Sequence, residues 1–376
     1  MDLQGSLSGH GASLKTYIVI VNWNGWKDTI ECLESVFRLR HSDFAVIVCD
    51  NGSRGDSLRG VMEWARGERM ATPASAEMGS YTSPPVPKPI VFSLLEGSSV
   101  NEPELSTGNR LVLIRSERNL GFAGGNNLGL RCILRRNDHG YVWLLNNDTV
   151  VHPDALTKLI GRVEEDPRIG ICGSRLCFYS APHFIQACGG STYSPRTGRN
   201  RHIGEFKPVS EAEDRAAVER QIGYVVGASL FVSRRFLSSI GLMSEDYFLY
   251  GEELDWATRA KGKFLQGYAP GSIVFHKQGN SMGGKSLTRQ SEPEESFLVS
   301  DFYSVRNQLR FTRRYYPQYL PFVGGTVAWR LLKRIAAGKW KRVRSVVRGV
   351  LSAFSEDPPP YPVSNGRGSL DLYASD

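Results

Sequence analysis

The sequence predicts an α/β protein built on a Rossmann-like, doubly wound mixed sheet with helices on both faces. First, an apolar strand at 16–22, a helical pattern at 26–38 and a second strand at 43–49 follow one another, which is an opening βαβ unit. Second, the apolar run at 141–145 is continuous, as in a strand covered on both faces of a sheet. Third, several of these runs end in oxygen-bearing side chains, where open α/β sheets bind their ligands.

The elements follow in order along the first half of the chain. Residues 1–15 are Gly/Ser-rich and predict a flexible tail before the first strand. The second strand ends at Asp50 and is followed by the turn residues Asn51-Gly52-Ser53. Residues 66–108 are rich in Pro, Ser, Glu and Gly, and we expect an inserted, largely mobile surface loop there. A strand at 111–115 and a helix at 121–136 resume the alternation.

The strand at 141–145 delivers the polar cluster Asn146-Asn147-Asp148. A carboxylate and two carboxamides offer hard oxygen ligands, which suit Mg²⁺ or Mn²⁺ bridging to substrate phosphates. The alternative is a strand that simply ends in an Asx turn. The neighbouring sequence has to decide between the two interpretations.

The second half of the predicted sheet continues with a helix at 153–165, a short strand at 169–174, a strand at 224–232 and a helix at 234–240. Residues 178–222 show no clear period, and we expect loops over the cleft. A further apolar strand at 271–275 ends in His276. A single histidine at a strand end is more often structural than a ligand, but the topology could bring it to the Asn-Asn-Asp cluster.

An acidic cluster lies at a predicted helix start, where Gly251 is followed by Glu252, Glu253 and Asp255. Acidic residues are favoured there by the helix dipole, which is the structural interpretation. The functional interpretation is that one carboxylate faces a cleft as a general base, while another caps the helix or pairs with Arg259.

Composition narrows the class of protein. The chain has 376 residues, 41% hydrophobic and 22% charged, as in an ordinary globular enzyme. Its six cysteines show no metal-ligand spacing, and no signal peptide or run of eighteen apolar residues is visible. We therefore expect a cytoplasmic protein, either free or peripheral at the inner face of the cell membrane.

The net charge of +8 is concentrated near the C-terminus, where residues 302–355 hold twelve basic side chains and no acidic one. We expect a basic amphipathic helical extension at 316–355, broken near Gly338, and a disordered tail at 356–376. Val327, Leu331, Ile335 and Trp340 could share an apolar stripe. Either this helix packs on the catalytic domain, or residues 320–355 contact an anionic membrane surface with Trp329 and Trp340 at the headgroups. No nucleic-acid motif accompanies the charge, so we expect no nucleic-acid partner.

Eight segments, taken together, resemble an inverting family 2 glycosyltransferase of the GT-A fold, in its rhamnosyltransferase-like branch. They share that family's order and spacing over residues 16–315. The segments are 18–25, Cys49–Ser53, Arg118–Asn127, Leu144–Thr149, Gly227–Ser229, Tyr250–Arg259, His276 and Phe302–Asn307. The resemblance implies a GT-A domain at 16–315.

The resemblance also implies roles for individual residues. Asp50 would contact the nucleotide base, and Asn22, Asn119, Gly121, Gly124, Asn126, Asn146 and Asn147 would lie along the nucleotide-sugar. Asn146-Asn147-Asp148 corresponds to the DXD metal motif, with Asn at its first position, so Asp148 would carry most of the charge on the cation. His276 would be a further metal ligand, and Glu253 the base, with Glu252 and Asp255 as alternates.

The predicted function is metal-dependent, inverting transfer of a sugar, by resemblance rhamnose, from a dTDP- or UDP-sugar to a saccharide or lipid-linked acceptor in cell-surface polysaccharide synthesis. Two alternatives remain open. A sugar-phosphate nucleotidyltransferase would need a basic, glycine-rich loop after the first strand, where this chain has Asn22-Trp-Asn-Gly25. A scaffold that binds nucleotide-sugars without catalysis is favoured by Asn146 but not by three carboxylates at the other site.

Overall fold

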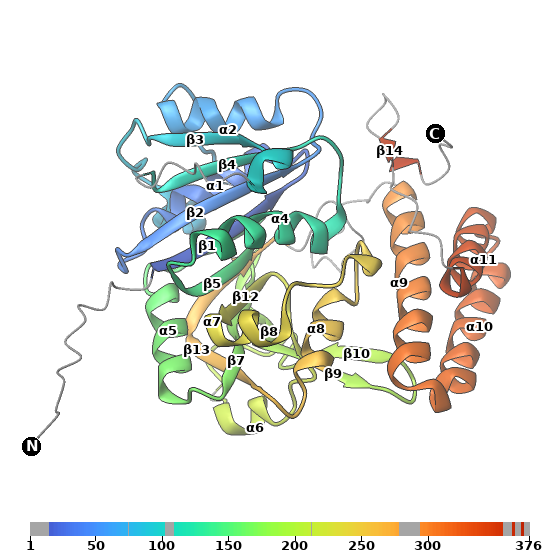
Figure 1. Ribbon diagram of the computed structural model, residues 1–376. Coiled ribbons are helices and arrows are strands. Elements are labelled where there is room, and N and C mark those ends of the chain that lie inside the picture. Colours follow the sequence, from blue (N-terminus) through green and yellow to red (C-terminus); the bar gives the residue numbers. More distant parts are fainter. Residues whose placement is uncertain are drawn as a thin grey trace, which may run out of the picture.

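The computed structural model describes residues 15–73, 75–101, 109–211, 213–277 and 294–355, with the pairs 363–364 and 370–371. Its centre is a ten-stranded mixed sheet of order β3-β4-β2-β1-β5-β12-β7-β13-β6, with β8 paired to β7 (Figure 1). The strands of this sheet are β1 (Lys15–Asn22), β2 (Phe44–Asn51), β3 (Phe92–Glu96), β4 (Leu111–Ser116), β5 (His139–Asn146), β6 (Thr149–Val151), β7 (Ile169–Phe178), β8 (Ala181–Cys188), β12 (Ser229–Ser233) and β13 (Leu265–His276).

The sheet is parallel from β3 to β5 and mixed beyond it. Strand β12 lies antiparallel between β5 and β7, whereas β13 runs parallel to β7 and antiparallel to β6. Because β1, β2 and β5 are parallel and in register, Asn22, Asp50 and Asn146 reach the same edge of the sheet. The ends of β13 and β5 also meet there, through β6 and the turn that carries Asp148.

Alternate side chains of the central strands pack into two cores, one on each face. In β1, Ile18 and Ile20 belong to one core, and Tyr17 and Val19 to the other. The first core is covered by α1 (Trp26–Val36), α2 (Ser57–Arg66) and α5 (Ala155–Glu165), and the second by α4 (Gly121–Arg136), α7 (Arg234–Ile240) and α8 (Glu252–Ala260). The predicted fold class, with helices on both faces of a mixed sheet, is therefore confirmed.

The segment 66–108 differs from the expected loop. It contains α3 (Ala76–Thr82), with Met78 fully buried, then β3 as the edge strand of the sheet and a short 3₁₀ helix, η1 (Gly97–Asn101). Serine 75 caps α3 by accepting from the Met78 N–H. These elements are too short to show a period in the sequence, and pairing with β4 stabilises β3. Residues 102–108 lie outside the described part of the chain.

The prediction of loops at 178–222 was wrong. That segment forms β8, β9 (Gly190–Ser194), β10 (Arg199–His202) and α6 (Arg215–Glu219). Strands β10, β9 and β11 (Tyr224–Val225) make a small three-stranded sheet, so the predicted strand at 224–232 is in fact two strands, β11 and β12. Strands β9 and β10 have only five and four residues, and no strand of this segment alternates buried and exposed positions, so the sequence shows no strand period.

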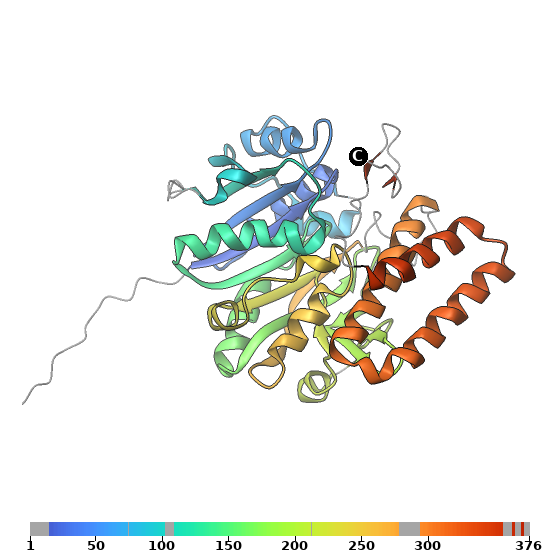
Figure 2. The same ribbon diagram turned by 45° about the vertical axis from the view of Figure 1, so that its right-hand side comes forward.

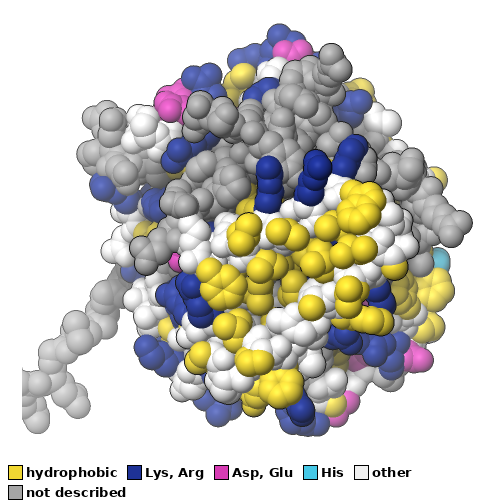
Figure 3. Space-filling model, turned by 90° about the vertical axis from the view of Figure 1, so that its right-hand side faces the viewer, with side chains coloured by type: hydrophobic (Ala, Val, Ile, Leu, Met, Phe, Trp, Pro, Cys, Tyr) yellow, Lys and Arg dark blue, Asp and Glu magenta, His cyan; other side chains and the backbone are white. Residues whose placement is uncertain are grey.

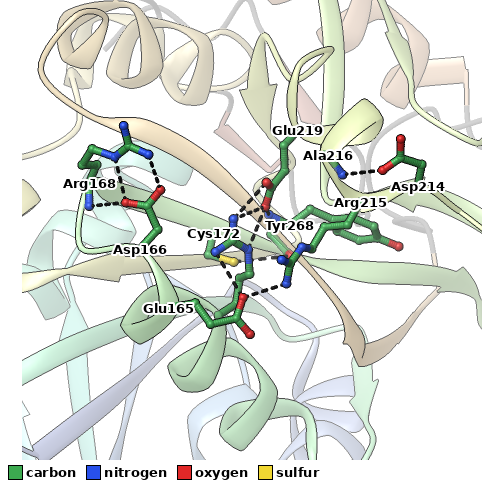
Figure 4. Close-up of polar contacts among 11 residues, drawn as sticks. Glu165, Asp166, Arg168, Cys172, Asp214, Arg215, Ala216, Glu219 and Tyr268 are labelled. Atoms are coloured by element: carbon green, nitrogen blue, oxygen red, sulfur yellow. Dashed lines mark hydrogen bonds and ion pairs between the residues drawn. The ribbon is translucent and has the colours of Figure 1, made fainter.

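Ion pairs and hydrogen bonds join α6 to α5 and β13 in a charged cluster that contains none of the predicted site residues (Figure 4). Arg215 pairs with Glu165 of α5 at 2.7 Å, and Glu219 accepts from the Tyr268 N–H of β13 at 2.8 Å. Asp214 caps α6 by accepting from the Ala216 N–H. All of these groups are satisfied by one another, so the cluster is structural.

Three helices pack against one side of this domain, as Figures 1 and 2 show: α9 (Glu294–Tyr315), α10 (Leu320–Ala336) and α11 (Trp340–Phe354). A 3₁₀ turn, η3 (Pro317–Tyr319), separates α9 from α10, and the predicted break near Gly338 separates α10 from α11. Among the described residues, no helix is both long and apolar enough to span a membrane.

The apolar stripe predicted for this region is divided between two surfaces. Val327 is buried and Leu331 packs against the cluster between the helices, whereas Ile335 and Trp340 are 39% and 63% exposed. Trp340 does not continue the stripe, because α10 ends at Ala336 and Trp340 begins the next helix, α11.

The two ends of the chain are described only in part. The expected tail at 1–15 falls outside the described residues except for Lys15, and of 356–376 only β14 (Val363–Ser364) and β15 (Leu370–Asp371) are described, as a short antiparallel pair. All six cysteines are free and buried.

Candidate active site

A cavity of about 1330 Å³ opens at the edge of the sheet where β1, β5 and β13 end. Its walls come from the turn after β5, from the segment that leads into α8, from the β9–β10 hairpin and from α9. A single small-molecule site usually occupies about 300–1,000 Å³, so this cavity has room for two ligands side by side.

Asp148 and His276 meet on one wall of the cavity. Asp148 lies in the turn between β5 and β6, and His276 is the last residue of β13, which pairs with β6 at Thr149. The Asp148 Oδ1 and His276 Nε2 atoms are 3.3 Å apart, and both side chains are largely buried. The Asn146 Nδ2 atom lies 3.4 Å from the same ring nitrogen. The structure thus brings the predicted metal ligands together.

Gln186 of β8, which the sequence did not single out, orients the imidazole. Its Oε1 atom lies 2.9 Å from His276 Nδ1, and in the tautomer in which Nδ1 donates to this oxygen, Nε2 is the ring nitrogen that can bind an ion. The next residue, Lys277, anchors the strand end by binding Asp28 at 2.6 Å and Glu31 at 2.5 Å, both on α1.

The donor set fits a hard divalent cation. Adjacent ligands of an octahedral ion with bonds of about 2.1 Å are roughly 3.0 Å apart, close to the separation of Asp148 Oδ1 and His276 Nε2. No cluster of three or more His, Cys, Asp or Glu suited to a metal occurs in the described part of the chain. An ion held by Asp148 and His276 would therefore complete its coordination with substrate oxygens and water.

Glu252 and Glu253 lie on another wall of the same cavity, in the first turn of α8. Glu252 is buried, and its Oε2 atom has no hydrogen-bond partner among the described residues. Burial, then the neighbouring Glu253 carboxylate, raises the pKa of Glu252 well above its usual value. Burial also raises the pKa of Glu253, but hydrogen bonds from backbone N–H groups, that of Gly227 among them, oppose this shift. The pKa of both carboxyl groups therefore lies above the usual range.

The segment before these glutamates is held in an unusual backbone conformation. Phe248 and Tyr250 have φ angles of 58° and 69°, in the left-handed region that non-glycine residues rarely adopt. Asn307 of α9 fixes them, because its Nδ2 atom donates to the carbonyl oxygens of Tyr247, Leu249 and Tyr250 at 2.7–2.8 Å. Helix α9 thus positions the start of α8.

Asp255, the other alternate base, lies away from the cavity. It is fully buried, pairs with Arg259 at 2.7 Å, and accepts hydrogen bonds from the hydroxyls of Tyr315 at 2.6 Å and Tyr247 at 3.2 Å. With both oxygens bound in this network, Asp255 stabilises the junction of α8 and α9 and has no free access to a substrate.

The glycine-rich turn before α4 borders the cavity through Asn119 and Gly121. Gly121 has a φ of +74°, and a Cβ there would lie 2.2 Å from the Phe248 carbonyl oxygen, so only glycine fits this close approach. Asn51, a cavity residue that the sequence did not single out, donates to Asn119 Oδ1 at 3.0 Å and accepts from the Leu120 N–H.

The other residues predicted to contact the nucleotide-sugar are divided between lining and supporting positions. Asn147 lines the cavity, and its Nδ2 atom donates to Thr29 Oγ1 at 3.0 Å. Asn22 and Asp50 are buried beneath the lining and bound to each other at 2.6 Å, while burial raises the pKa of Asp50. Gly124 and Asn126, both buried in α4, do not border the cavity.

Several residues that line the cavity could not be predicted from the sequence, because no strand pattern or motif marks them. They come from the β9–β10 hairpin and the C-terminal helices: Arg199, Arg201, His202, Gln308 and Arg330. No local sequence pattern identifies these side chains as cavity residues, so only the tertiary structure shows that they belong to the site.

The α/β fold brings a carboxylate–imidazole pair and a glutamate pair to one cavity, an arrangement suited to group transfer with a carboxylate base. Residues 101–236 match the model of the family described as Glycosyl transferase family 2, and together with the relatives below this match supports a glycosyltransferase of rhamnosyltransferase-like type. The matched segment includes Asn146–Asp148 but ends before the glutamates and His276.

Curated relatives share this part of the chain. The N-acetylglucosaminyl-diphospho-decaprenol L-rhamnosyltransferase of Mycobacterium tuberculosis (strain ATCC 25618 / H37Rv) is 27% identical over 193 residues, covering 46% of this chain and 60% of the relative. The poly-beta-1,6-N-acetyl-D-glucosamine synthase of Staphylococcus aureus (strain COL) is 21% identical over 235 residues, covering 59% of this chain and 51% of that protein. The chain thus spans between half and two thirds of these relatives.

Among solved structures, the mannosyltransferase PcManGT from Pyrobaculum calidifontis, in complex with GDP-Man and Mn²⁺, superposes with a TM-score of 0.47 at 12% identity. The superposition covers 91% of this chain and 88% of that one.

Proposed function

We propose that the protein is a metal-dependent inverting glycosyltransferase that moves a sugar from a nucleotide-sugar to a saccharide or lipid-linked acceptor. The observation that supports this most is the shared cavity. Asp148 and His276 lie on one wall and Glu252 and Glu253 on another, although these pairs come from distant parts of the chain. Such a cavity can hold the diphosphate of a donor and the hydroxyl of an acceptor at the same time.

The reaction is a single in-line displacement. The acceptor oxygen forms a bond to the anomeric carbon while the bond from that carbon to the diphosphate oxygen breaks, which inverts the configuration. Glu253 takes the acceptor hydroxyl proton as the new bond forms, and backbone N–H groups that bond to its carboxylate favour the charged form needed for this role. Burial and the Glu253 carboxylate raise the pKa of Glu252, and in its protonated form this group can donate a hydrogen bond from Oε2, which has no partner among the described residues.

Asp148 and His276 would hold Mg²⁺ or Mn²⁺, which when bound neutralises the charge of the departing diphosphate. Gln186 keeps the ring of His276 in the tautomer that leaves Nε2 free to bind the ion. Asn119, Gly121 and Asn147 line the donor side of the cavity.

A dTDP- or UDP-sugar donor, with rhamnose as the transferred sugar, is the specific form of this proposal. It is supported by the relative that is named as a rhamnosyltransferase acting on N-acetylglucosaminyl-diphospho-decaprenol. By the same analogy, the acceptor is a lipid-linked saccharide of cell-surface polysaccharide synthesis.

A peripheral contact with an anionic membrane belongs to the same proposal. Helices α10 and α11 expose large apolar side chains, and Figure 3 shows them as one continuous field bordered by Lys and Arg. The exposed residues on these helices are Phe322, Trp329, Leu332, Ile335, Trp340, Val347, Leu351 and Phe354. Apolar side chains flanked by cations, with no acidic residue in residues 302–355, suit the headgroup layer of anionic lipid.

The substitution Glu253→Gln tests the chemistry. General-base catalysis contributes about 10²–10⁴-fold, so turnover should fall by that factor while binding of the nucleotide-sugar with Mn²⁺ stays within about twofold. Calorimetry gives the binding and a radiolabelled donor gives the transfer. Full turnover in Glu253→Gln, with loss of turnover in Glu252→Gln, would assign the base to Glu252 instead.

A further inference from the structure

We propose that the end of the cavity between the β9–β10 hairpin and α10 is a binding site for the phosphate or diphosphate group of the acceptor. This inference rests on the proposed function in treating the bound molecule as an acceptor. The site itself is defined by three arginines that line the cavity and come from the hairpin and α10: Arg199, Arg201 and Arg330.

The hairpin is fastened to the C-terminal helices, which holds the arginines in place. Gln308 of α9 donates from Nε2 to the carbonyl oxygens of Thr197 and Gly198 at 3.2 and 3.1 Å. The same side chain accepts from Arg330 Nη1 through its Oε1 atom at 3.1 Å. One glutamine therefore joins the hairpin turn to α10, and Arg330 is brought beside the first residue of β10, Arg199.

None of the three arginines has a carboxylate within ion-pair distance among the described residues, whereas Arg334 and Arg342 both bind Asp301. Arg330 lies one turn before Arg334 on α10 and is left with only the amide oxygen of Gln308. Burial, and then the nearby charges of Arg334 and Arg199, lower the pKa of Arg330, while the more weakly acting Asp301 carboxylate, which Arg334 and Arg342 bind, opposes this shift.

The other titratable groups in the cavity leave this end cationic. Glu205, which follows β10, is the carboxylate nearest in sequence to the arginines, and His202 is hydrogen-bonded to Ser191 at 2.7 Å. The remaining carboxylates of the lining belong to α1, to the turn of Asp148 and to the glutamate pair. Guanidinium groups without a carboxylate partner bind phosphate oxygens through paired hydrogen bonds.

The position of the site indicates why a lipid-linked anion fits it. Arg330 follows the exposed Trp329 on α10, and Arg196 of the hairpin turn lies over the ring of Phe322 at 5.0 Å. The cationic end of the cavity therefore borders the apolar field of Figure 3. A diphosphate bound here would place a saccharide toward the glutamates and a polyprenyl chain toward α10. An anionic headgroup of the bilayer is the other source of the same chemistry.

Binding of farnesyl diphosphate to the full chain in EDTA tests the proposal, because without a cation the probe cannot bind through Asp148 and His276. We expect farnesyl diphosphate to bind at least about tenfold more tightly than farnesol, and Arg199→Gln and Arg330→Gln each to weaken its binding about tenfold. The matched control Arg196→Gln removes the same charge from the same hairpin outside the cavity lining, and should change binding less than twofold.

Equal binding of farnesyl diphosphate by the wild type, Arg199→Gln and Arg330→Gln would overturn the proposal, as would an equal loss in Arg196→Gln. Arg199 is exposed, so its variant keeps the test valid if Arg330→Gln fails to fold. Phosphatidylglycerol vesicles distinguish the two sources: a defect confined to vesicle binding assigns the arginines to a headgroup and contradicts an acceptor site. The probe is not turned over, so Glu253→Gln should bind it normally even if sugar transfer is never found.

Discussion

At the scale of single residues, the site depends on two adjacent glutamates with different surroundings. Both accept hydrogen bonds from backbone N–H groups that favour the charged form, but one oxygen of Glu252 has no partner among the described residues, and the Glu253 carboxylate raises the pKa of Glu252 further. The N-terminus of α8 favours negative charge, but two carboxylates this close do not ionise together easily. We therefore expect one carboxyl group of the pair to hold its proton while the other is ionised.

The pH dependence of turnover should report this pair. Glu253 is active as a carboxylate, and burial raises its pKa above the usual value of 4.5. We expect kcat/KM to fall as the pH drops through that raised pKa, so that the acid limb lies clearly above pH 4.5. A pH profile of kcat/KM measures it. An acid limb at or below pH 4.5 would contradict the assignment of Glu253 as the base.

Glu252 should make the fold less stable as the pH rises. A carboxyl group whose pKa is raised in the folded state contributes stability below its unfolded pKa, and this is lost as the pH rises through the folded value. Between the two values, the loss is about 1.4 kcal/mol per pH unit. We expect Glu252→Gln to melt at a higher temperature than the wild type at pH 7, with the difference vanishing near pH 4. Thermal melts at both pH values provide the check.

At the scale of elements, the contact between α4 and the segment before α8 closes the site. The Phe122 N–H donates to the Phe248 carbonyl oxygen at 2.7 Å, and Gly121 allows the two backbones to meet. Asn307 of α9 holds the other side of the same segment. Three elements distant in sequence therefore fix the position of the glutamates.

Gly121→Ala should disturb that contact. The positive φ of Gly121 alone costs an alanine about 1–2 kcal/mol, and the new Cβ meets the Phe248 carbonyl. We expect a lower midpoint in urea and weaker nucleotide-sugar binding. Gly161→Ala is the control: a Cβ there has open space within α5, so alanine should stabilise the helix by up to about 1 kcal/mol. Equal effects of the two substitutions would refute the role of Gly121.

The apolar field on α10 and α11 should bind anionic vesicles. Trp329→Ser and Leu351→Ser remove side chains that are 54% and 67% exposed, so the fold should tolerate them. Burying one large apolar side chain contributes about 1.5–3 kcal/mol, so each substitution should reduce binding to phosphatidylglycerol vesicles about tenfold. Val91→Ser, at a similarly exposed position on the catalytic domain, is the control. Co-sedimentation measures binding, and the proposal fails if both variants sediment like the wild type.

At the scale of the whole molecule, the candidate catalytic and binding residues meet at one edge of the sheet. The end of β5, the end of β13, the start of α8 and the β9–β10 hairpin all reach one cavity. Helices α9 and α10 complete it with Asn307, Gln308 and Arg330, so the C-terminal extension is a wall of the site as well as the candidate membrane face.

The sequence was sufficient for the strands and helices of the doubly wound core, because long apolar runs and helical periods do not depend on distant contacts. It also pointed to Asp148, His276, Glu252 and Glu253, since each follows a strand end or begins a helix. It could not separate Glu253 from Asp255, which lie two positions apart. Only packing shows that Asp255 is enclosed by Arg259 and Tyr315.

Only the tertiary structure shows which elements the short or aperiodic segments form and which side chains they supply to the cavity. Strands β9 and β10 have few residues and depend on pairing with each other, so their sequence carries no period, yet they supply Arg199 and Arg201. Gln186 has no motif, and its function depends on the ring of His276, ninety positions away. Local sequence thus determined which elements form, whereas the long-range contacts between them determined which side chains share the cavity.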